Sequence, residues 1–154
     1  MENTVIRKAT DQDMKDIMEL IISVFNGEQT IPTELIPIPD ELTPRWWCAD
    51  ENGVITGSIA LYQEHGEWHL GRFAVSPNRR GVSLGSRLFE TAVQDIFQSG
   101  IEVLYCEARD TTVHIILKHG GRIIGEAVPF FKGNVTPMLI SKDSFEKHEA
   151  VYCY

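Results

Sequence analysis

The chain has 154 residues, of which 43% are hydrophobic and 23% are charged, and its formal net charge is −8. These values are typical of one folded globular domain, expected here over residues 1–154, and they argue against a disordered or fibrous protein. The negative charge disfavours nucleic-acid binding, because that affinity comes mostly from clustered lysine and arginine. It favours a cationic small molecule or a basic protein segment as the partner.

Cysteine usage and hydropathy indicate the cellular setting. The three cysteines, Cys48, Cys106 and Cys153, have no CxxC spacing, which argues against a disulfide framework and against a zinc site. The longest nearly apolar stretch, residues 17–25, contains Glu19 and is too short to cross a bilayer. The N-terminal residues do not resemble a secretory signal. We therefore expect a cytoplasmic protein with free thiols, no metal and no membrane contact.

A short strand, a helix and an irregular segment are predicted first along the chain. Residues 5–9 are rich in β-formers and are predicted to form the strand. Thr10 is a good N-cap, and apolar residues then recur at three- and four-residue intervals until Gly27, so a helix is predicted between them. Residues 30–44 carry four prolines, which excludes a continuous helix or a central strand. We expect an irregular excursion there, of the kind that often holds substrates.

A β-meander is predicted next. Residues 45–49 and 54–62 flank Asn52-Gly53, and this dipeptide is the strongest short signal for a tight hairpin turn. A third strand is predicted over residues 68–75. The first half of the chain should therefore form neighbouring antiparallel strands.

The second half alternates between helical and extended patterns. A helix is predicted over residues 84–97, because its apolar positions share one face, and a strand over residues 101–108. A short helix over residues 112–118 should then lead to two strands, residues 122–126 and 136–141, around a loop. The element order is that of an α/β protein.

The most informative stretch, residues 75–88, connects a predicted strand to a predicted helix. A helix N-terminus offers unpaired backbone N–H groups and the positive end of the helix dipole, which together suit a phosphate. Gly81 and Gly85 let the backbone approach such a ligand closely. The N–H groups of residues 81–86 can form a concave site for a pyrophosphate, with Arg80 as a charged donor. The alternative is an ordinary strand-to-helix turn with surface arginines.

This stretch resembles motif A of the GNAT acetyltransferases, Val-x-Pro-x-x-(Arg/Gln)-Gly-x-Gly-(Ile/Leu)-Gly-x-x-Leu, with Ser83 in place of the middle glycine. Residues 24–32 resemble the Val-Phe-x-x-Glu-Gln-x-(Ile/Val)-Pro segment that ends the first helix in one bacterial branch of the family. Lys118-His119-Gly120 resembles the Lys-x-Gly that closes the last helix. The order of the predicted elements is also that of the family.

The resemblance implies an α/β (α+β) three-layer fold, in which a mixed, mostly antiparallel central sheet has splayed fourth and fifth strands and flanking helices. Acetyl-CoA would lie between residues 68–75 and 101–108. The implied activity is transfer of an acetyl group from acetyl-CoA to a primary amine of a small molecule or peptide, and a homodimer is the expected assembly. The implied acetyl-CoA-binding residues lie on the fourth strand and the motif turn: Phe73, Ala74, Val75, Arg80, Gly81, Val82, Ser83, Leu84, Gly85 and Ser86.

The catalytic positions depart from the family pattern. The tyrosine that many relatives use as the general acid falls on Ile116, which has no proton to donate. The glutamate that some relatives carry on the fourth strand falls on Gly71 or Arg72. A catalytically weak protein that binds or senses acyl-CoA is therefore an alternative function. Transfer of a different acyl group, or transfer to a different acceptor, is a third possible function.

Glu107 and His114 are the substitutes that we predict for the catalytic roles. Glu107 ends the fifth strand, where a carboxylate can accept a proton, although a solvated strand-end charge fits equally well. His114 can act near neutral pH, but a packed or exposed histidine is the alternative. Glu28 is predicted to hold a cationic acceptor, with a salt bridge as the alternative. Cys106 has no partner histidine that would make it a nucleophile.

Overall fold

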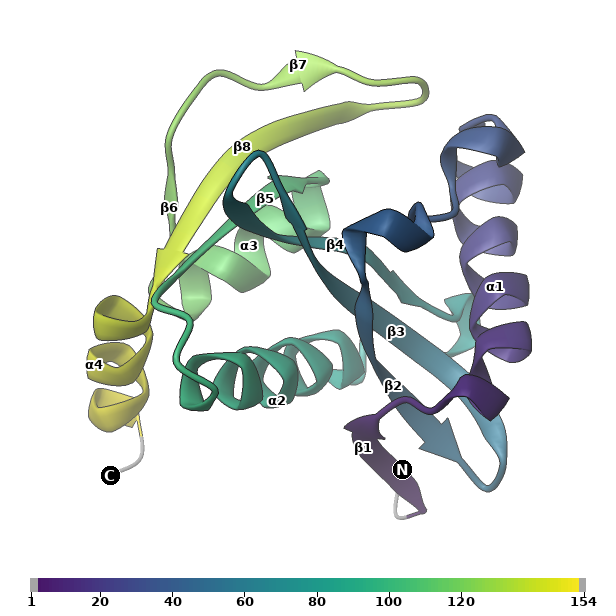
Figure 1. Ribbon diagram of the computed structural model, residues 1–154, viewed down its shortest axis with the longest axis horizontal. Helices are drawn as coiled ribbons and strands as arrows, with labels where there is room; N and C mark the ends of the chain where they lie inside the picture. Colours follow the sequence, from purple (N-terminus) through teal and green to yellow (C-terminus); the bar gives the residue numbers. More distant parts are fainter. Residues whose placement is uncertain (1–2, 153–154) are drawn as a thin grey trace.

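The computed structural model describes residues 3–152 and has an eight-stranded sheet at its centre (Figure 1). The strand order is β1-β2-β3-β4-β5-β8-β6, and β7 pairs with the outer part of β8. The strands are β1 (Thr4–Lys8), β2 (Arg45–Glu51), β3 (Val54–Glu64), β4 (Glu67–Val75), β5 (Val103–Ala108), β6 (Arg122–Ile123), β7 (Val128–Pro129) and β8 (Asn134–Ser141). The α-helices are α1 (Met14–Ile22), α2 (Leu84–Gln98), α3 (Asp110–Lys118) and α4 (Lys142–Tyr152).

Helices cover both faces of the sheet and give three layers. The α1 helix packs on one face, and α2 and α3 pack on the other (Figure 1). Each face has its own core: one contains Ile17 and Ile21 of α1, and the other contains Leu88 and Phe89 of α2. Every strand pair is antiparallel except β4–β5, which is parallel. The predicted fold class is confirmed.

The fourth and fifth strands separate, as the family resemblance implied. They pair only where His69 meets Tyr105 and Leu70 meets Cys106. Beyond these pairs, a register shift against β3 interrupts β4, and Arg72 adopts a positive φ of 51°. An extra residue in one strand bends it and increases its twist. The last part of β4 therefore leaves β5, and a gap opens between the two strands.

Local sequence signals explain two features of the first half. Asn52 and Gly53 both have positive φ, 53° and 88°, as the predicted tight hairpin turn requires. At the start of the first helical segment, the backbone N–H of Thr10 donates to Asp13 Oδ2 at 2.7 Å, and the Thr10 hydroxyl donates to the same oxygen at 3.1 Å. A 3-10 turn (Asp11–Asp13) leads from this cap into α1.

Three expectations need correction. The first helix does not end at Gly27, because α1 continues as π-helical turns (Ser23–Glu28) that carry the chain to Gln29. The strand predicted over residues 122–126 is reduced to β6, and β7 follows after a bend. The α4 helix was not predicted, because its mixture of Lys, Glu and His gives only a weak apolar stripe.

The cysteines and the helix lengths complete the description. Cys48 and Cys106 are free thiols, and Cys153 lies outside the described residues. None of the helices within residues 3–152 combines the length and the apolar content that a membrane crossing requires.

Candidate functional site

The turn before α2 has the backbone shape that the sequence motif predicted. Gly81 and Ser83 both have positive φ, 84° and 67°, and Ser83 is the N-cap of α2. The first N–H groups of a helix have no acceptor within the helix. Here the residues that carry these groups, Leu84, Gly85 and Ser86, line a cavity of about 380 Å³, which we call the helix cleft. An anion in this cleft would meet several N–H donors and the positive end of the α2 dipole.

Most of the predicted acetyl-CoA-binding residues line the helix cleft. Val82 is the exception, since its side chain is 48% exposed and lies outside the lining. Gly85 lies in the wall of the cleft, where a Cβ built on it would make van der Waals contact with Ile115 and Phe73, each at 3.5 Å. The predicted residues that line the cleft are Phe73, Ala74, Val75, Arg80, Gly81, Ser83, Leu84, Gly85 and Ser86.

Arg80 and Glu28, predicted for different ligands, form an ion pair with each other at the helix cleft. Arg80 donates from Nη1 to Glu28 Oε1 at 2.7 Å and from Nη2 to Oε2 at 3.1 Å. Its Nε donates to the Val75 carbonyl at 3.0 Å. Both side chains are substantially exposed, 45% and 37%, so the pair is weak and can be exchanged for another anion. Glu28 therefore lies beside Arg80 at the helix cleft, and it does not lie in the gap between β4 and β5.

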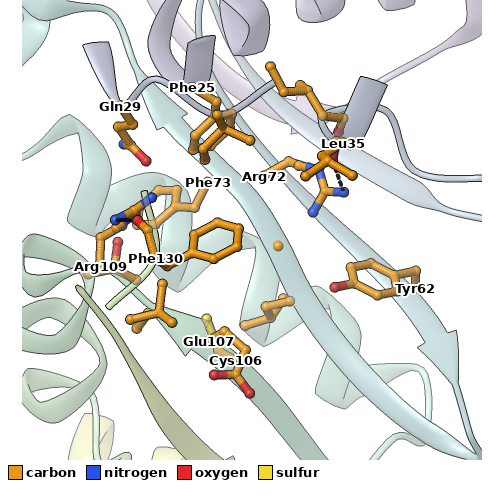
Figure 2. Close-up of a pocket in the computed structure, with 17 residues that line it drawn as sticks. Phe25, Gln29, Leu35, Tyr62, Arg72, Phe73, Cys106, Glu107, Arg109 and Phe130 are labelled. Carbon is orange, nitrogen blue, oxygen red and sulfur yellow. Dashed lines mark hydrogen bonds between the residues drawn. The ribbon is translucent and has the colours of Figure 1, made fainter. Parts of the chain in front are cut away.

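A second cavity, of about 430 Å³, occupies the gap between β4 and β5 (Figure 2). We call it the apolar cavity, because most of its walls are aliphatic or aromatic. Arg72 supports one wall: its Nε donates to the Ile36 carbonyl and its Nη2 donates to the Leu35 carbonyl. The hydrophobic residues that line the cavity are Phe25, Ile31, Leu35, Ile36, Tyr62, Leu70, Phe73, Cys106, Ala108, Phe130 and Val135.

The two cavities meet at a junction formed by Gln29, Phe73, Arg109 and Thr112, which line both. Arg109 Nη1 donates to the carbonyls of Phe130, at 2.9 Å, and Lys132, at 3.2 Å. Its guanidinium lies over the Phe130 ring, 5.2 Å from the centroid. Burial lowers the pKa of Arg109. The arginine therefore pins the β7–β8 hairpin over the junction.

The predicted catalytic residues are separated by the fold. Glu107 lines the apolar cavity and is exposed to solvent. His114 lies on the exposed side of α3 and is not among the residues lining either cavity. Ile116 is 1% exposed and packs in the core. Cys106 lines the apolar cavity, but burial raises the pKa of its thiol to about 12, so the nucleophilic thiolate is scarce.

Ser86 belongs to a hydrogen-bonded chain that links the helix cleft to α4. Its Oγ lies 3.0 Å from His119 Nε2, and His119 Nδ1 lies 2.7 Å from Glu149 Oε1. A carboxylate only accepts hydrogen bonds, so His119 carries a proton on Nδ1. With neutral His119, the Ser86 hydroxyl donates to Nε2.

Glu90, His119 and Glu149 also form a set that could hold a metal ion, since their ligand atoms lie within 4.8 Å of one another. Both ring nitrogens of His119 already have hydrogen-bond partners, and one of these is Glu149. Hydrogen bonding therefore accounts for the placement of His119 and Glu149 without an ion.

Sequence reasoning singled out Phe73 but missed the other residues of the junction, Gln29, Arg109 and Thr112, and Phe130 beside them. Gln29 stood inside a segment that resembles the family, so a signal existed, but nothing indicated where its side chain would lie. Arg109 directly follows the fifth strand and precedes α3, a position at the carboxyl end of a parallel pair where ligand-binding groups are common. Phe130 had no signal, because its place depends on the β7–β8 hairpin.

Known proteins share both the sequence pattern and the fold. The sequence model of the acetyltransferase (GNAT) family matches residues 14–120. The fold is similar to that of a putative N-acetyltransferase from Lactobacillus plantarum, with a TM-score of 0.77 and 15% identity, covering 90% of this chain and 97% of that chain. It is also similar to Escherichia coli ElaA, with a TM-score of 0.74 and 16% identity, covering 88% and 97%. A third similar structure is an acyl-CoA N-acyltransferase from Pseudomonas aeruginosa, with a TM-score of 0.72 and 19% identity, covering 90% and 99%.

No match emerges when the sequence is compared with curated proteins. The family match spans most of the chain, from α1 through the motif turn to the end of α3. The chain therefore belongs to the acetyltransferase (GNAT) family, and the predicted family is confirmed. An acyl-CoA is the kind of substrate that this family uses.

Proposed function

We propose that this chain acts as a single domain that transfers an acetyl group from acetyl-CoA to a primary amine of a small molecule or peptide. The observation that carries this proposal is the junction: the helix cleft, which suits a pyrophosphate, opens at Phe73 and Arg109 into a separate cavity. Two substrates bound from opposite sides would meet there. Holding both in one complex lets the amine attack the thioester directly.

The helix cleft is the proposed site for acetyl-CoA. The backbone N–H groups of residues 81–86 would bind the pyrophosphate, and Arg80 would exchange Glu28 for a phosphate oxygen. The part of β4 that has left β5 has backbone groups free of a ladder partner on that side, and these suit the pantetheine amides. A backbone N–H at Phe73 would lie where the thioester carbonyl needs an oxyanion donor.

Glu107 is the proposed general base. In the transfer step, the amine nitrogen forms a bond to the thioester carbonyl carbon, the C–S bond breaks, and the amine loses a proton to the Glu107 carboxylate. The departing thiolate takes a proton from water, because Ile116 occupies the position of the usual tyrosine acid. Solvent exposure of Glu107 supports this role, since the proton can then pass to bulk water.

A second candidate function, binding or sensing of acyl-CoA without efficient turnover, is favoured by one observation. Ile116, at the position of the usual tyrosine acid, is buried in the core and has no proton to donate to the departing thiolate. Release of coenzyme A thiol in the presence of a panel of primary amines separates the two functions. Turnover above the rate of hydrolysis supports the transferase, and tight binding without turnover supports the sensor.

The test of the donor site is calorimetric titration with acetyl-CoA, using ATP as a control ligand. We expect saturable binding by the wild-type protein and its loss in Gly85→Glu, because the new carboxylate would fill the cleft and repel phosphate. Gly27→Glu is the matched control, since a side chain at this exposed glycine meets nothing within 4 Å. Thermal unfolding of both variants checks that they fold. Absence of acetyl-CoA binding by the folded wild type would refute the proposal.

A further inference from the structure

The junction holds two polar atoms that the fold leaves without partners. Among the buried side-chain nitrogen and oxygen atoms of the described residues, Gln29 Oε1 and Arg109 Nη2 have no hydrogen-bond partner. Both residues line both cavities, and in Figure 2 their side chains lie at the same end of the apolar cavity, opposite Tyr62. Buried polar groups in proteins are nearly always hydrogen-bonded, so this pair calls for a ligand. The ligand must accept from Arg109 and donate to Gln29.

The charge at the junction requires an anion. Within the described residues, neither Arg109 nor Arg72 takes part in an ion pair. Arg72 uses its guanidinium on the carbonyls of Leu35 and Ile36, whereas Arg109 uses Nη1 on the hairpin and keeps Nη2 unpaired. Arg109 as a residue is partly exposed, but its Nη2 is buried without a hydrogen-bond partner, and a carboxylate satisfies such a charged donor better than a neutral carbonyl does.

The rest of the apolar cavity requires a hydrophobic group. Phe25, Tyr62 and Phe130 come from three separate segments and face the same space. Pockets of this composition bind apolar or aromatic groups, and their few polar side chains fix the orientation. Glu107 is the one carboxylate of the lining, and it lies on the β5 wall.

From these contacts we infer that the acetyl acceptor is an α-amino acid with a large apolar or aromatic side chain, whose carboxylate binds Arg109. The inference rests on the proposed acetyl transfer and names its acceptor class. An α-amino group is two bonds from its carboxylate, so a carboxylate on Arg109 holds the amine at the junction beside Gln29. The side chain of the acceptor then extends toward Tyr62. An α-amino acid of this kind satisfies the anion, donor and apolar requirements together.

This acceptor differs from the cationic partner that the net charge of the chain favoured. The overall charge of −8 describes the surface, whereas the lining of the apolar cavity contains two guanidinium groups and one carboxylate. A bound substrate contacts the groups that line the cavity, so the charge of this lining, and not the net charge of the chain, determines which acceptor is preferred.

The test compares three acceptors that share a 2-phenylethylamine skeleton: L-phenylalanine, L-phenylalaninamide and 2-phenylethylamine. They differ only in the group on the α-carbon, which is a carboxylate, an amide or hydrogen. With acetyl-CoA saturating, we expect kcat/KM for phenylalanine to exceed the values for the other two by about tenfold or more, the usual gain from a hydrogen bond between charged groups. In Arg109→Gln this preference for phenylalanine should fall by about tenfold, because an amide side chain has no charge to offer. Arg45→Gln is the matched control, since Arg45 also stacks on an aromatic ring, that of Trp68, but lies outside both cavities.

The ratio of the kcat/KM values for two acceptors is taken within one variant. A general loss of activity, caused by a looser β7–β8 hairpin in Arg109→Gln, therefore cancels in the ratio. Calorimetry of N-acetyl-L-phenylalanine against N-acetyl-2-phenylethylamine gives a readout that needs no turnover, and the carboxylate form should bind more tightly to the wild type only. A preference for the uncharged acceptors, or a ratio unchanged by Arg109→Gln, overturns the inference while leaving acetyl transfer intact. Loss of acetyl-CoA affinity in Arg109→Gln with an unchanged ratio would assign Arg109 to the donor instead. Failure of the wild type to bind acetyl-CoA is a different result, and it refutes the proposed function itself.

Discussion

The helix cleft and the apolar cavity share a junction but are built in opposite ways. The cleft takes most of its wall from one continuous stretch, residues 73–86, and offers mainly backbone groups. The apolar cavity is assembled from the chain after α1, from β3, β4 and β5, and from the β7–β8 hairpin, and it offers side chains. A ligand recognised by local backbone can be inferred from a short motif. A ligand recognised by side chains from distant segments can be inferred only from the folded chain.

Removal of the proposed base should have the largest effect on catalysis. Glu107→Gln keeps the size of the side chain but cannot accept the amine proton, so we expect kcat to fall by about a hundredfold. Acetyl-CoA affinity should stay unchanged, because Glu107 lies outside the helix cleft. Stopped-time assays of coenzyme A release measure the first effect and calorimetry the second. The control is Glu102→Gln, an exposed glutamate just before the same strand; equal rates for the two variants would place the base elsewhere.

The ion pair at the helix cleft should affect the donor alone. Arg80→Gln should weaken acetyl-CoA binding by about tenfold through loss of a charge-assisted hydrogen bond. Glu28→Gln should strengthen binding a little, because it frees the guanidinium from its bidentate partner. Titrations at low and high salt measure both changes, and the difference between variants should shrink as salt screens the charges. Weaker donor binding by Glu28→Gln would show that Glu28 itself contacts the ligand.

An ion pair between Arg7 and Asp13 holds the start of the first helix. This helix leads to Gln29, which lines both cavities. Arg7 donates to both carboxylate oxygens of Asp13, at 2.8 and 2.9 Å, and these bonds hold the pKa of Asp13 well below its usual range. Asp13→Asn should lower the free energy of unfolding by about 1 kcal/mol at pH 7, a modest value because Arg7 is partly exposed. Denaturant unfolding at a series of pH values measures it.

The pH dependence of that effect has a definite sign. A carboxyl group whose pKa is depressed by folding stabilises the protein above its unfolded pKa, about 4, and loses that contribution as the pH falls further. The difference between wild type and Asp13→Asn should therefore be constant at neutral pH and shrink below about pH 4. A difference that persists in acid would mean that the substitution acts through packing.

Ser83 tests how far the motif turn tolerates a side chain. Its φ of 67° is a conformation that favours glycine. Ser83→Gly should raise the free energy of unfolding by up to about 1 kcal/mol, since the relief of strain exceeds the entropy lost on folding. Ser99 ends the same helix with an ordinary φ of −80°, so Ser99→Gly should lower stability. If both variants are destabilised equally, the Ser83 backbone carries no strain.

The contrast between the cavities also explains which features the sequence predicted. The motif turn, the Asn52-Gly53 hairpin and the amphipathic α2 depend on neighbours within a few residues, and all three were predicted. The partnership of Arg80 with Glu28 was not, because the two residues are brought together only when the π-helical end of the first helix reaches the turn. The positions of Arg109 and Phe130 in the site were not predicted for the same reason, because they depend on contacts between segments that are distant in the sequence.

The positions of the candidate catalytic residues were harder to predict than the shape of the motif turn, for a physical reason. Glu107 was expected at the end of the fifth strand beside the gap, and it lines the apolar cavity there, because the end of the splayed strand β5 fixes its position. His114 had the right chemistry, but helical rotation places it on the exposed side of α3. A titratable residue on a short helix can face any direction, and the burial pattern that decides it comes from the packing partners.

The most direct test of the account joins the two substrates in one molecule. In this analogue, the sulfur of coenzyme A is linked through an acetyl group to the nitrogen of L-phenylalanine, so that it spans both cavities through the junction. We predict that it binds about a hundredfold more tightly than coenzyme A, because the second half binds at a high effective concentration. Gly85→Glu should abolish the binding of both ligands, and Arg109→Gln should remove the gain of the analogue over coenzyme A. An affinity equal to that of coenzyme A, unchanged by Arg109→Gln, would contradict acetyl transfer across the junction.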